Sequence, residues 1–178
     1  MNRHLFPLFI ICFLLSCVQS GKNDIKKIIQ DWQEKEIVKP DIINYKILGK
    51  DTVCNELWDK PFRVLTYIDS VGCTGCRLRL PEWKMLIDSC RQQSIDISFI
   101  FIVHSSDFLS FTSDVKYQEF SEPIIYDYQN QFYKLNRFPP EPYRTFLLDS
   151  QNRVQLIGNP IETPQMWELY KKVITQSK

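Results

Sequence analysis

The sequence predicts an α/β domain with a central mixed β-sheet flanked by α-helices and an N-terminal helical extension. A β-branched and aromatic run at 63–68 and a near-continuous apolar run at 95–103 are typical of buried strands. The segments between and after these runs carry apolar residues at helical spacing, so strands alternate with helices early in the chain. Two short strands around a turn at 149–152 predict an antiparallel hairpin that closes the sheet.

Composition indicates one ordinary folded domain. The chain has 178 residues, of which 44% are hydrophobic and 24% charged, so disordered and fibrous classes are excluded. The 22 basic and 21 acidic side chains give a formal net charge of +1. Proteins that bind nucleic acid usually show a clear basic excess, so we expect no nucleic-acid partner.

Residues 1–16 are predicted to be a lipoprotein signal peptide. A short basic start precedes an apolar run at 5–15, which is too short to span the roughly 30 Å hydrocarbon core of a membrane. The sequence Leu14-Leu15-Ser16-Cys17 resembles the bacterial lipobox, so Cys17 is expected to carry the lipid, although an ordinary secretion signal is the alternative. The protein is therefore expected in the cell envelope, anchored to the membrane and facing the periplasm or cell exterior, where disulfides persist.

The N-terminal extension, residues 17–44, is predicted to be a lipidated tether followed by a helix. Asp24 is the expected N-cap of a helix over 25–38, because Ile28 and Trp32 recur at helical spacing there. A strand at 42–48 and a turn at 49–51 should follow, and the main domain is predicted to span residues 45–178.

The main domain should alternate strands and helices. The β-branched and aromatic run 63–68 predicts a central strand, and residues 76–93 predict a helix with Trp83 and Cys90 on its inner side. Ser105 or Ser106 is the expected cap of a helix to about residue 120. The rest should comprise a strand at 123–126, a helical turn or two at 129–135, a rigid proline-rich loop at 137–142, hairpin strands at 143–148 and 154–157, and a helix from Thr163-Pro164 to about 175.

The chemistry is expected at Cys73-Thr74-Gly75-Cys76, between a buried strand and a helix. A helix N-terminus presents unpaired amide hydrogens and a partial positive charge, which stabilise a thiolate. The first cysteine there can be a nucleophile with a pKa below the free value of about 8.5. Two intervening residues let the second thiol close a disulfide within one helical turn, so Cys73 would attack and Cys76 would resolve.

These features resemble the thioredoxin-like superfamily, and among its members the membrane-tethered TlpA-like thiol-disulfide oxidoreductases. The resemblance covers about residues 45–175. The resemblance rests on four features: a central strand at 64–68, a Cys-x-x-Cys-Arg signature at 73–77, Pro81 as the proline that bends the active-site helix, and a hairpin at 145–154. It implies a thioredoxin-like fold and disulfide exchange with protein thiols or disulfides of the cell envelope, supplied by an upstream electron donor.

The chain departs from the family pattern in several places. Gly72 and Gly75 stand where the family has Trp and Pro beside the cysteines, and Tyr67 replaces the buried acid of thioredoxins. Asp69 lies closer to the motif and is expected on the other face of the strand. The family's cis-proline position is Tyr143, so either Pro142 serves instead or the cis bond is absent. The residues expected to shape the partner groove are Gly72, Thr74, Gly75, Pro142, Tyr143 and Arg144.

Alternatives remain for the site and the function. A thiol peroxidase of the same fold would usually have Thr where Ser70 stands, and a binding lipoprotein on the same scaffold would need no redox pair. A stable structural disulfide between Cys73 and Cys76 is the alternative interpretation of the motif. No metal or cofactor is expected, because a second ligand pair is missing and His104, the one histidine after the signal segment, reads as structural. Cys54 and Cys90 are expected to be buried thiols, with a disulfide between them as the alternative. Arg77 and Arg79 are expected to form a solvated face, with a positive potential that favours the Cys73 thiolate as the alternative.

Overall fold

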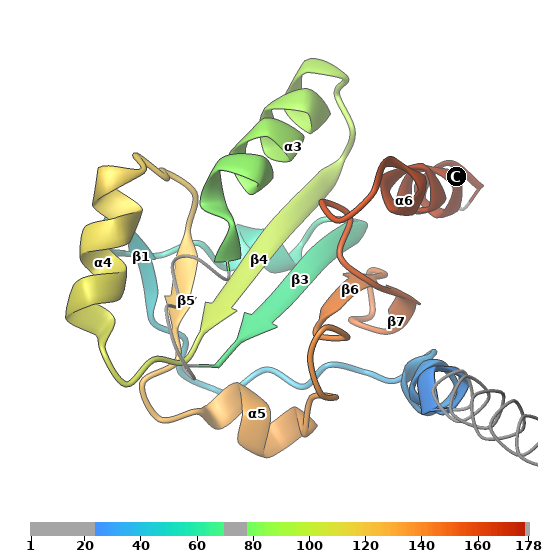
Figure 1. The fold of residues 1–178 in the computed structure, drawn as a ribbon, viewed down its shortest axis with the longest axis horizontal. Coiled ribbons are helices and arrows are strands. Elements are labelled where there is room, and N and C mark those ends of the chain that lie inside the picture. Colours follow the sequence, from blue (N-terminus) through green and yellow to red (C-terminus); the bar gives the residue numbers. More distant parts are fainter. Residues whose placement is uncertain (1–23, 70–77, 177–178) are drawn as a thin grey trace, which may run out of the picture.

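The structure is a computed structural model that describes residues 24–69 and 78–176. It confirms the predicted class, because these residues form a mixed sheet of seven strands in the order β2-β1-β5-β4-β3-β6-β7 (Figure 1). The strands are β1 (Tyr45–Ile47), β2 (Lys50–Thr52), β3 (Phe62–Ile68), β4 (Ile97–Val103), β5 (Ile124–Tyr126), β6 (Thr145–Leu148) and β7 (Val154–Ile157).

The helices cover both faces of this sheet. Residues 24–32 are helical, and the later helices are η1 (Asn55–Trp58), α3 (Leu80–Gln92), α4 (Phe108–Tyr117), α5 (Gln131–Asn136) and α6 (Pro164–Gln176). Buried side chains of α3, α4 and α6 pack on one face, whereas those of α5, η1 and the helix at 24–32 pack on the other. None of the helices in the described ranges is both long and apolar enough to cross a membrane.

The strand pairing places the end of β3 at the centre of one sheet edge. β3 pairs with β4 in parallel, and β4 pairs with β5 in parallel, with α3 and α4 as the crossover helices. β6 returns antiparallel to β3 on its other side, and β7 follows as a hairpin with a register shift between Leu147 and Leu148. The segment with the cysteine motif begins directly after β3.

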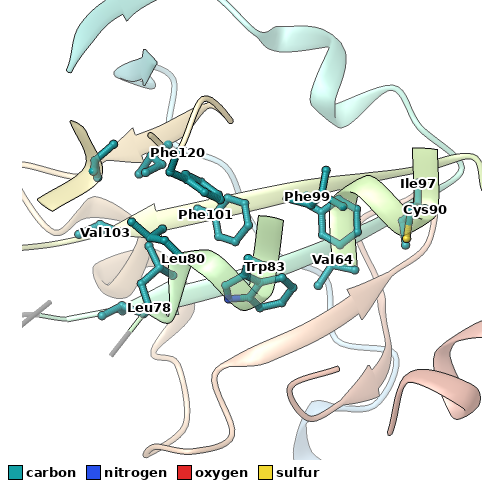
Figure 2. Close-up of a cluster of buried hydrophobic side chains, with 14 of the residues drawn as sticks. Val64, Leu78, Leu80, Trp83, Cys90, Ile97, Phe99, Phe101, Val103 and Phe120 are labelled. Atoms are coloured by element: carbon teal, nitrogen blue, oxygen red, sulfur yellow. The ribbon is translucent and has the colours of Figure 1, made fainter. Parts of the chain in front are cut away.

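Buried aromatic residues pack both sides of β3 and β4. On the α3 side, Trp83 meets Phe99 and Phe101 edge to face, with ring centroids 6.1 and 5.2 Å apart (Figure 2). All seven residues of β4 are buried, as the sequence predicts for a strand covered on both faces. On the opposite face, the rings of Trp32 and Phe146 stack with their centroids 5.1 Å apart.

The N-terminal elements differ most from their predicted boundaries. Asp24, the expected N-cap, is itself helical, and the helix ends at residue 32 rather than 38. Glu34 adopts a left-handed conformation with φ of 62°, and the chain then runs extended beside β7. The strand predicted at 42–48 forms only over Tyr45–Ile47. Tertiary pairing therefore decides where these elements begin and end.

Two helix starts also differ from the expectation. α3 begins at Leu80 after Arg79, whose φ is 53°, so Pro81 lies in its first turn. The cap of α4 is Asp107, neither Ser105 nor Ser106, because its carboxylate accepts hydrogen bonds from the backbone N–H and hydroxyl of Ser110 at 3.0 and 2.6 Å. The side-chain oxygen of an aspartate thus satisfies a helix-terminal donor here.

Candidate functional site

The predicted site residues fall into two groups. Pro142, Tyr143 and Arg144 are described by the structure. The remaining predicted site residues lie outside the described residues: Cys17, Gly72, Cys73, Thr74, Gly75 and Cys76, together with Ser70 and Arg77. The site is therefore built from the residues that frame the motif, between Asp69 at the end of β3 and Leu78 before α3.

Pairing of β3 with β6 brings the proline-rich loop to the end of β3. The backbone N–H of Tyr67 donates to the carbonyl of Arg144 at 3.0 Å. One step inside the sheet, the hydroxyls of Thr66 and Thr145 share a hydrogen bond of 2.7 Å between two buried side chains. The strand that leads into the cysteine motif is thus held against the loop that carries Pro142.

The peptide bond between Glu141 and Pro142 is cis. Of the two alternatives left open by the sequence, the structure therefore has a cis-proline at 142. The loop around it is held by the N–H of Tyr143, which donates to the carbonyl of Pro140 at 3.1 Å. The guanidinium Nε of Arg144 donates to the carbonyl of Pro139 at 2.7 Å, which ties the strand start to the loop.

Arg144 is the electrostatic centre of the described site. Its Nη1 lies 2.7 Å from Oδ2 of Asp69 and 3.9 Å from Oε1 of Glu141. Its guanidinium carbon also lies 5.7 Å from the centre of the Tyr67 ring. Asp69 and Tyr67 consequently lie on the same side, and the expectation that Asp69 occupies the other face was wrong. Asp69 directly follows β3 and lies two residues after Tyr67, so the alternation of the strand puts both on one face, where Arg144 contacts both.

Tyr67 is a buried hydrogen-bond donor where thioredoxins have an acid. Its hydroxyl donates to Oδ1 of Asn130 at 2.7 Å, and its ring stacks on Phe138 with centroids 4.5 Å apart. Burial raises the pKa of the Tyr67 phenol well above its usual value. The phenol therefore stays neutral near pH 7, where it can donate a hydrogen bond but does not replace a carboxylate as a proton acceptor.

A depression of about 210 Å³ opens beside the cis-proline. Its lining includes Thr66, Ile68, Pro142, Thr145, Asn159 and Glu162. Arg79 forms ion pairs with two glutamates. Its Nη1 lies 2.8 Å from Oε1 of Glu162, and its Nε lies 3.2 Å from Oε1 of Glu82. Arg79 thus lies within a small ion-pair network that joins α3 to the segment before α6.

The two described cysteines are structural thiols. Cys54 and Cys90 are both free and buried, and they belong to hydrophobic clusters on opposite faces of the sheet. A Cys54–Cys90 disulfide, one alternative from the sequence, is therefore wrong. Burial raises the pKa of both thiols, that of Cys90 to about 11, so neither is a reactive thiolate near neutral pH.

His104 is a structural residue at the end of β4. Its backbone N–H donates to the carbonyl of Ile68 at 2.9 Å, which links the ends of β4 and β3. Its ring Nδ1 lies 2.9 Å from the carbonyl of Asp127. The Asp127 carboxylate accepts from the backbone N–H groups of Gln131 and Phe132 and thereby caps α5. In the part of the chain that the structure describes, no group of three or more His, Cys, Asp or Glu residues could hold a metal ion.

Comparison with known proteins identifies the fold. The sequence matches no protein-family model, and it matches no curated protein. The thioredoxin domain of a thiol-disulfide oxidoreductase from Bacteroides vulgatus is similar in structure, with a TM-score of 0.58 and 10% identity over 80% of this chain and 97% of that domain. A thiol:disulfide interchange protein from Bacteroides sp. has a TM-score of 0.57 and 10% identity over 80% of this chain and 91% of its own. A mutant of PrxQ from Xylella fastidiosa has a TM-score of 0.56 and 14% identity over 83% and 98%.

The chain therefore has the thioredoxin-like fold, as its sequence motifs predict. The strand that leads into the cysteine motif, the crossover helix after it and the cis-proline loop beside it occur in the order that the resemblance implies. The Asp69–Arg144 ion pair and the Phe138–Tyr67 stack were not predicted. A sequence signal existed only for Arg144, as a groove residue next to Pro142.

Proposed function

We propose that this protein is a lipid-anchored thiol-disulfide oxidoreductase of the cell envelope. Cys73 is the nucleophile and Cys76 is the resolving thiol. The partners are protein disulfides outside the cytoplasm, and an upstream dithiol donor restores the reduced enzyme. The groove that receives the partner includes Pro142, Tyr143 and Arg144.

The reaction proceeds by two exchanges. The Cys73 thiolate attacks one sulfur of the partner disulfide, so a new S–S bond forms while the partner's second sulfur leaves as a thiolate and takes a proton from water. The Cys76 thiolate then attacks the Cys73 sulfur and releases the partner's first sulfur. The partner gains two electrons as a dithiol, and Cys73 and Cys76 are left as a disulfide that the donor reduces.

One observation supports the proposal most. β3, which leads into the Cys-x-x-Cys segment, is joined to the cis-Pro142 loop by the Tyr67 N–H···O=C bond of 3.0 Å to Arg144 and by the Thr66–Thr145 hydroxyl pair. This arrangement places the partly exposed residues 142–144 next to the end of β3, after which the redox motif follows in the chain. An extended partner segment could align there as an added strand.

Two rival functions use the same scaffold. The likeness to PrxQ shows only that a thiol peroxidase is compatible with this fold, and Ser70 does not match the usual threonine. A binding lipoprotein would use the groove without exchanging electrons. Consumption of hydrogen peroxide with dithiothreitol as donor distinguishes the first rival, and reversible titration of the Cys73–Cys76 pair in a redox buffer distinguishes the second.

The proposal is tested by trapping the mixed disulfide. Insulin, a protein with accessible disulfides, is incubated with the reduced full chain and resolved on a non-reducing gel. In Cys76→Ser the second exchange lacks its thiolate, so we expect a reducible adduct between Cys73 and insulin. Cys73→Ser should trap much less, because in the proposed mechanism Cys76 attacks the Cys73 sulfur and not the partner disulfide.

A matched control uses the buried thiols. Cys76→Ser combined with Cys90→Ala should trap as much insulin as Cys76→Ser alone, since Cys90 is buried and its pKa is raised. Trapping by Cys73→Ser in place of Cys76→Ser would reverse the two roles. The absence of any adduct with insulin, and with a cell-envelope extract, would rule out the oxidoreductase function.

A further inference from the structure

The segment that precedes the domain packs against the proline-rich loop. Trp32, at the end of the helix over 24–32, is 6% exposed. Its ring stacks on Phe138 at 5.9 Å and on Phe146 at 5.1 Å, and the ammonium of Lys35 lies 3.7 Å from its centre. Phe138 is part of the loop and Phe146 is part of β6, so Trp32 packs against both the loop and the strand that follows it.

Backbone hydrogen bonds fix this segment to the start of β7. The N–H of Glu34 donates to the carbonyl of Val154 at 2.9 Å, and the N–H of Val154 donates to the carbonyl of Lys35 at 3.0 Å. The N–H of Ile37 adds a bond of 2.9 Å to the carbonyl of Asn152. The segment therefore has one defined register against the domain.

Asn136 clamps the same segment to the beginning of the loop. Its Oδ1 accepts from the N–H of Val38 at 2.8 Å, and its Nδ2 donates to the carbonyl of Val38 at 2.9 Å. The ammonium of Lys35 donates to the backbone carbonyl of Asn136 at 3.0 Å, at the C-terminal end of α5. The Asn136 side chain is 3% exposed, so its amide is buried, whereas Val38 on the other side of the clamp is exposed.

A continuous set of contacts connects Trp32 with the groove. Trp32 stacks on Phe138, Phe138 stacks on Tyr67, and the guanidinium of Arg144 lies over Tyr67. Arg144 binds the carbonyl of Pro139 and the carboxylate of Asp69. Trp32, which precedes the main domain in the chain, thus packs through Phe138 against the loop from 137 to 144 that contains cis-Pro142.

We infer that Trp32 is a positioning residue for the partner groove. The N-terminal segment 24–38 thereby contributes to the binding of partner proteins. It acts through Phe138, which holds the loop in the shape that accepts an extended protein segment. This inference rests on the proposed function in one respect, namely that partners bind along the cis-Pro142 loop.

The test compares Trp32→Ala with Trp58→Ala in the full chain. The two tryptophans are matched, because Trp58 is 7% exposed, stacks on Phe132 at 6.5 Å and has the ammonium of Lys39 at 5.0 Å from its centre. Both belong to the same hydrophobic cluster, but Trp58 lies in η1, before β3, and it has no ring contact with the loop. A general loss of stability should therefore affect both variants, whereas loosening of the loop should appear only in Trp32→Ala.

The first readout is amide hydrogen exchange, which needs no activity. Backbone amides of residues 137–146 should exchange about tenfold faster in Trp32→Ala than in Trp58→Ala, because two stacked ring contacts with this region are lost. Trp32→Phe keeps a flat ring at this position and should restore most of the protection. Equal exchange of the loop in Trp32→Ala and Trp58→Ala would overturn the inference.

The second readout separates binding from chemistry. For insulin reduction with dithiothreitol as donor, we expect Trp32→Ala to raise KM several-fold with little change in kcat. Its rate with 5,5′-dithiobis(2-nitrobenzoate), which is too small to occupy an extended groove, should equal that of the wild type. An unchanged KM for insulin, despite faster loop exchange, would also overturn the inference. If the wild type reduced neither disulfide, the proposed function would fail, and hydrogen exchange would still decide whether Trp32 holds the loop.

Discussion

Cys90 lies on the inner side of α3, where it is 2% exposed in the cluster that contains Trp83. Burial disfavours its thiolate and raises the pKa of the thiol to about 11. In the unfolded chain the same thiol ionises near its free value of about 8.5. The native state therefore keeps a proton that the unfolded state releases over the interval between these two values.

This difference predicts that stability is lost on the alkaline side. The contribution of Cys90 to the free energy of unfolding is fully present below about pH 8.5. It falls as the pH rises towards 11, by roughly 3 kcal/mol at most. In a Cys73→Ser/Cys76→Ser background, the free energy of unfolding in urea should be lower at pH 10.5 than at pH 7. Adding Cys90→Ala should make this difference between the two pH values smaller. Tyrosines also titrate at high pH, but they contribute equally to both proteins. An identical pH dependence in the two proteins would contradict the assignment.

At the scale of elements, the β1–β2 hairpin depends on one glycine. Leu48 and Gly49 both have positive φ, at 49° and 78°, in the two-residue turn between paired Ile47 and Lys50. A Cβ at Gly49 would lie 2.4 Å from Cγ2 of Thr112 in α4. The turn therefore needs glycine for its backbone conformation and for the close approach of the helix.

Gly49→Ala should lower the free energy of unfolding by about 2 kcal/mol or more, since strain at positive φ and a steric clash add. Thr112→Ser removes the clashing methyl but keeps the hydroxyl that donates to the carbonyl of Phe108. In that background, Gly49→Ala should cost only about 1 kcal/mol, which is the part due to φ. Urea unfolding of the four proteins in this cycle provides the measurement. Equal costs in both backgrounds would mean that the Thr112 contact relaxes freely.

Element types were predictable from the sequence, whereas several boundaries and contacts were not. β4 was predictable, because residues 95–103 are a near-continuous apolar run of the kind that forms a strand covered on both faces. The helix end at residue 32 was missed, because Glu34, Lys35 and Glu36 are good helix formers, and pairing with β7 overrides their propensity. The Asp69–Arg144 pair joins residues far apart in the chain, so no local pattern could reveal it.

On the scale of the whole molecule, the proposal places a folded domain on a lipid anchor. Only residues 18–23 separate Cys17 from the first described helical residue, Asp24. A fully extended chain spans at most about 3.5 Å per residue, so the anchor and the start of the helix would lie no more than about 25 Å apart. Partners would then have to reach the domain close to the membrane surface.

Cys17→Ser tests this arrangement. The variant should appear in the soluble fraction or as an unprocessed precursor, because more than one acyl chain is needed for stable anchoring and serine cannot be lipidated in this way. Membrane fractionation and mass spectrometry of the mature protein provide the measurement. Cys12→Ser, in the apolar run, is the matched control and should leave the protein in the membrane fraction. A wild-type protein without an acyl group would refute the anchoring proposal.

The pairing of residues 34–37 with β7 has one more consequence, which concerns crowding. Molecules confined to a surface meet one another at high effective concentration, and open strand edges promote sheet-to-sheet aggregation under such conditions. At the β7 side of the described sheet, Glu36 forms an antiparallel bridge with Arg153, the residue before β7, so the start of this edge is covered. At the other side, β2 is only three residues long, and its Lys50 and Asp51 are exposed. We therefore expect the native domain to remain monomeric at densities at which a sheet with long, apolar open edges would associate.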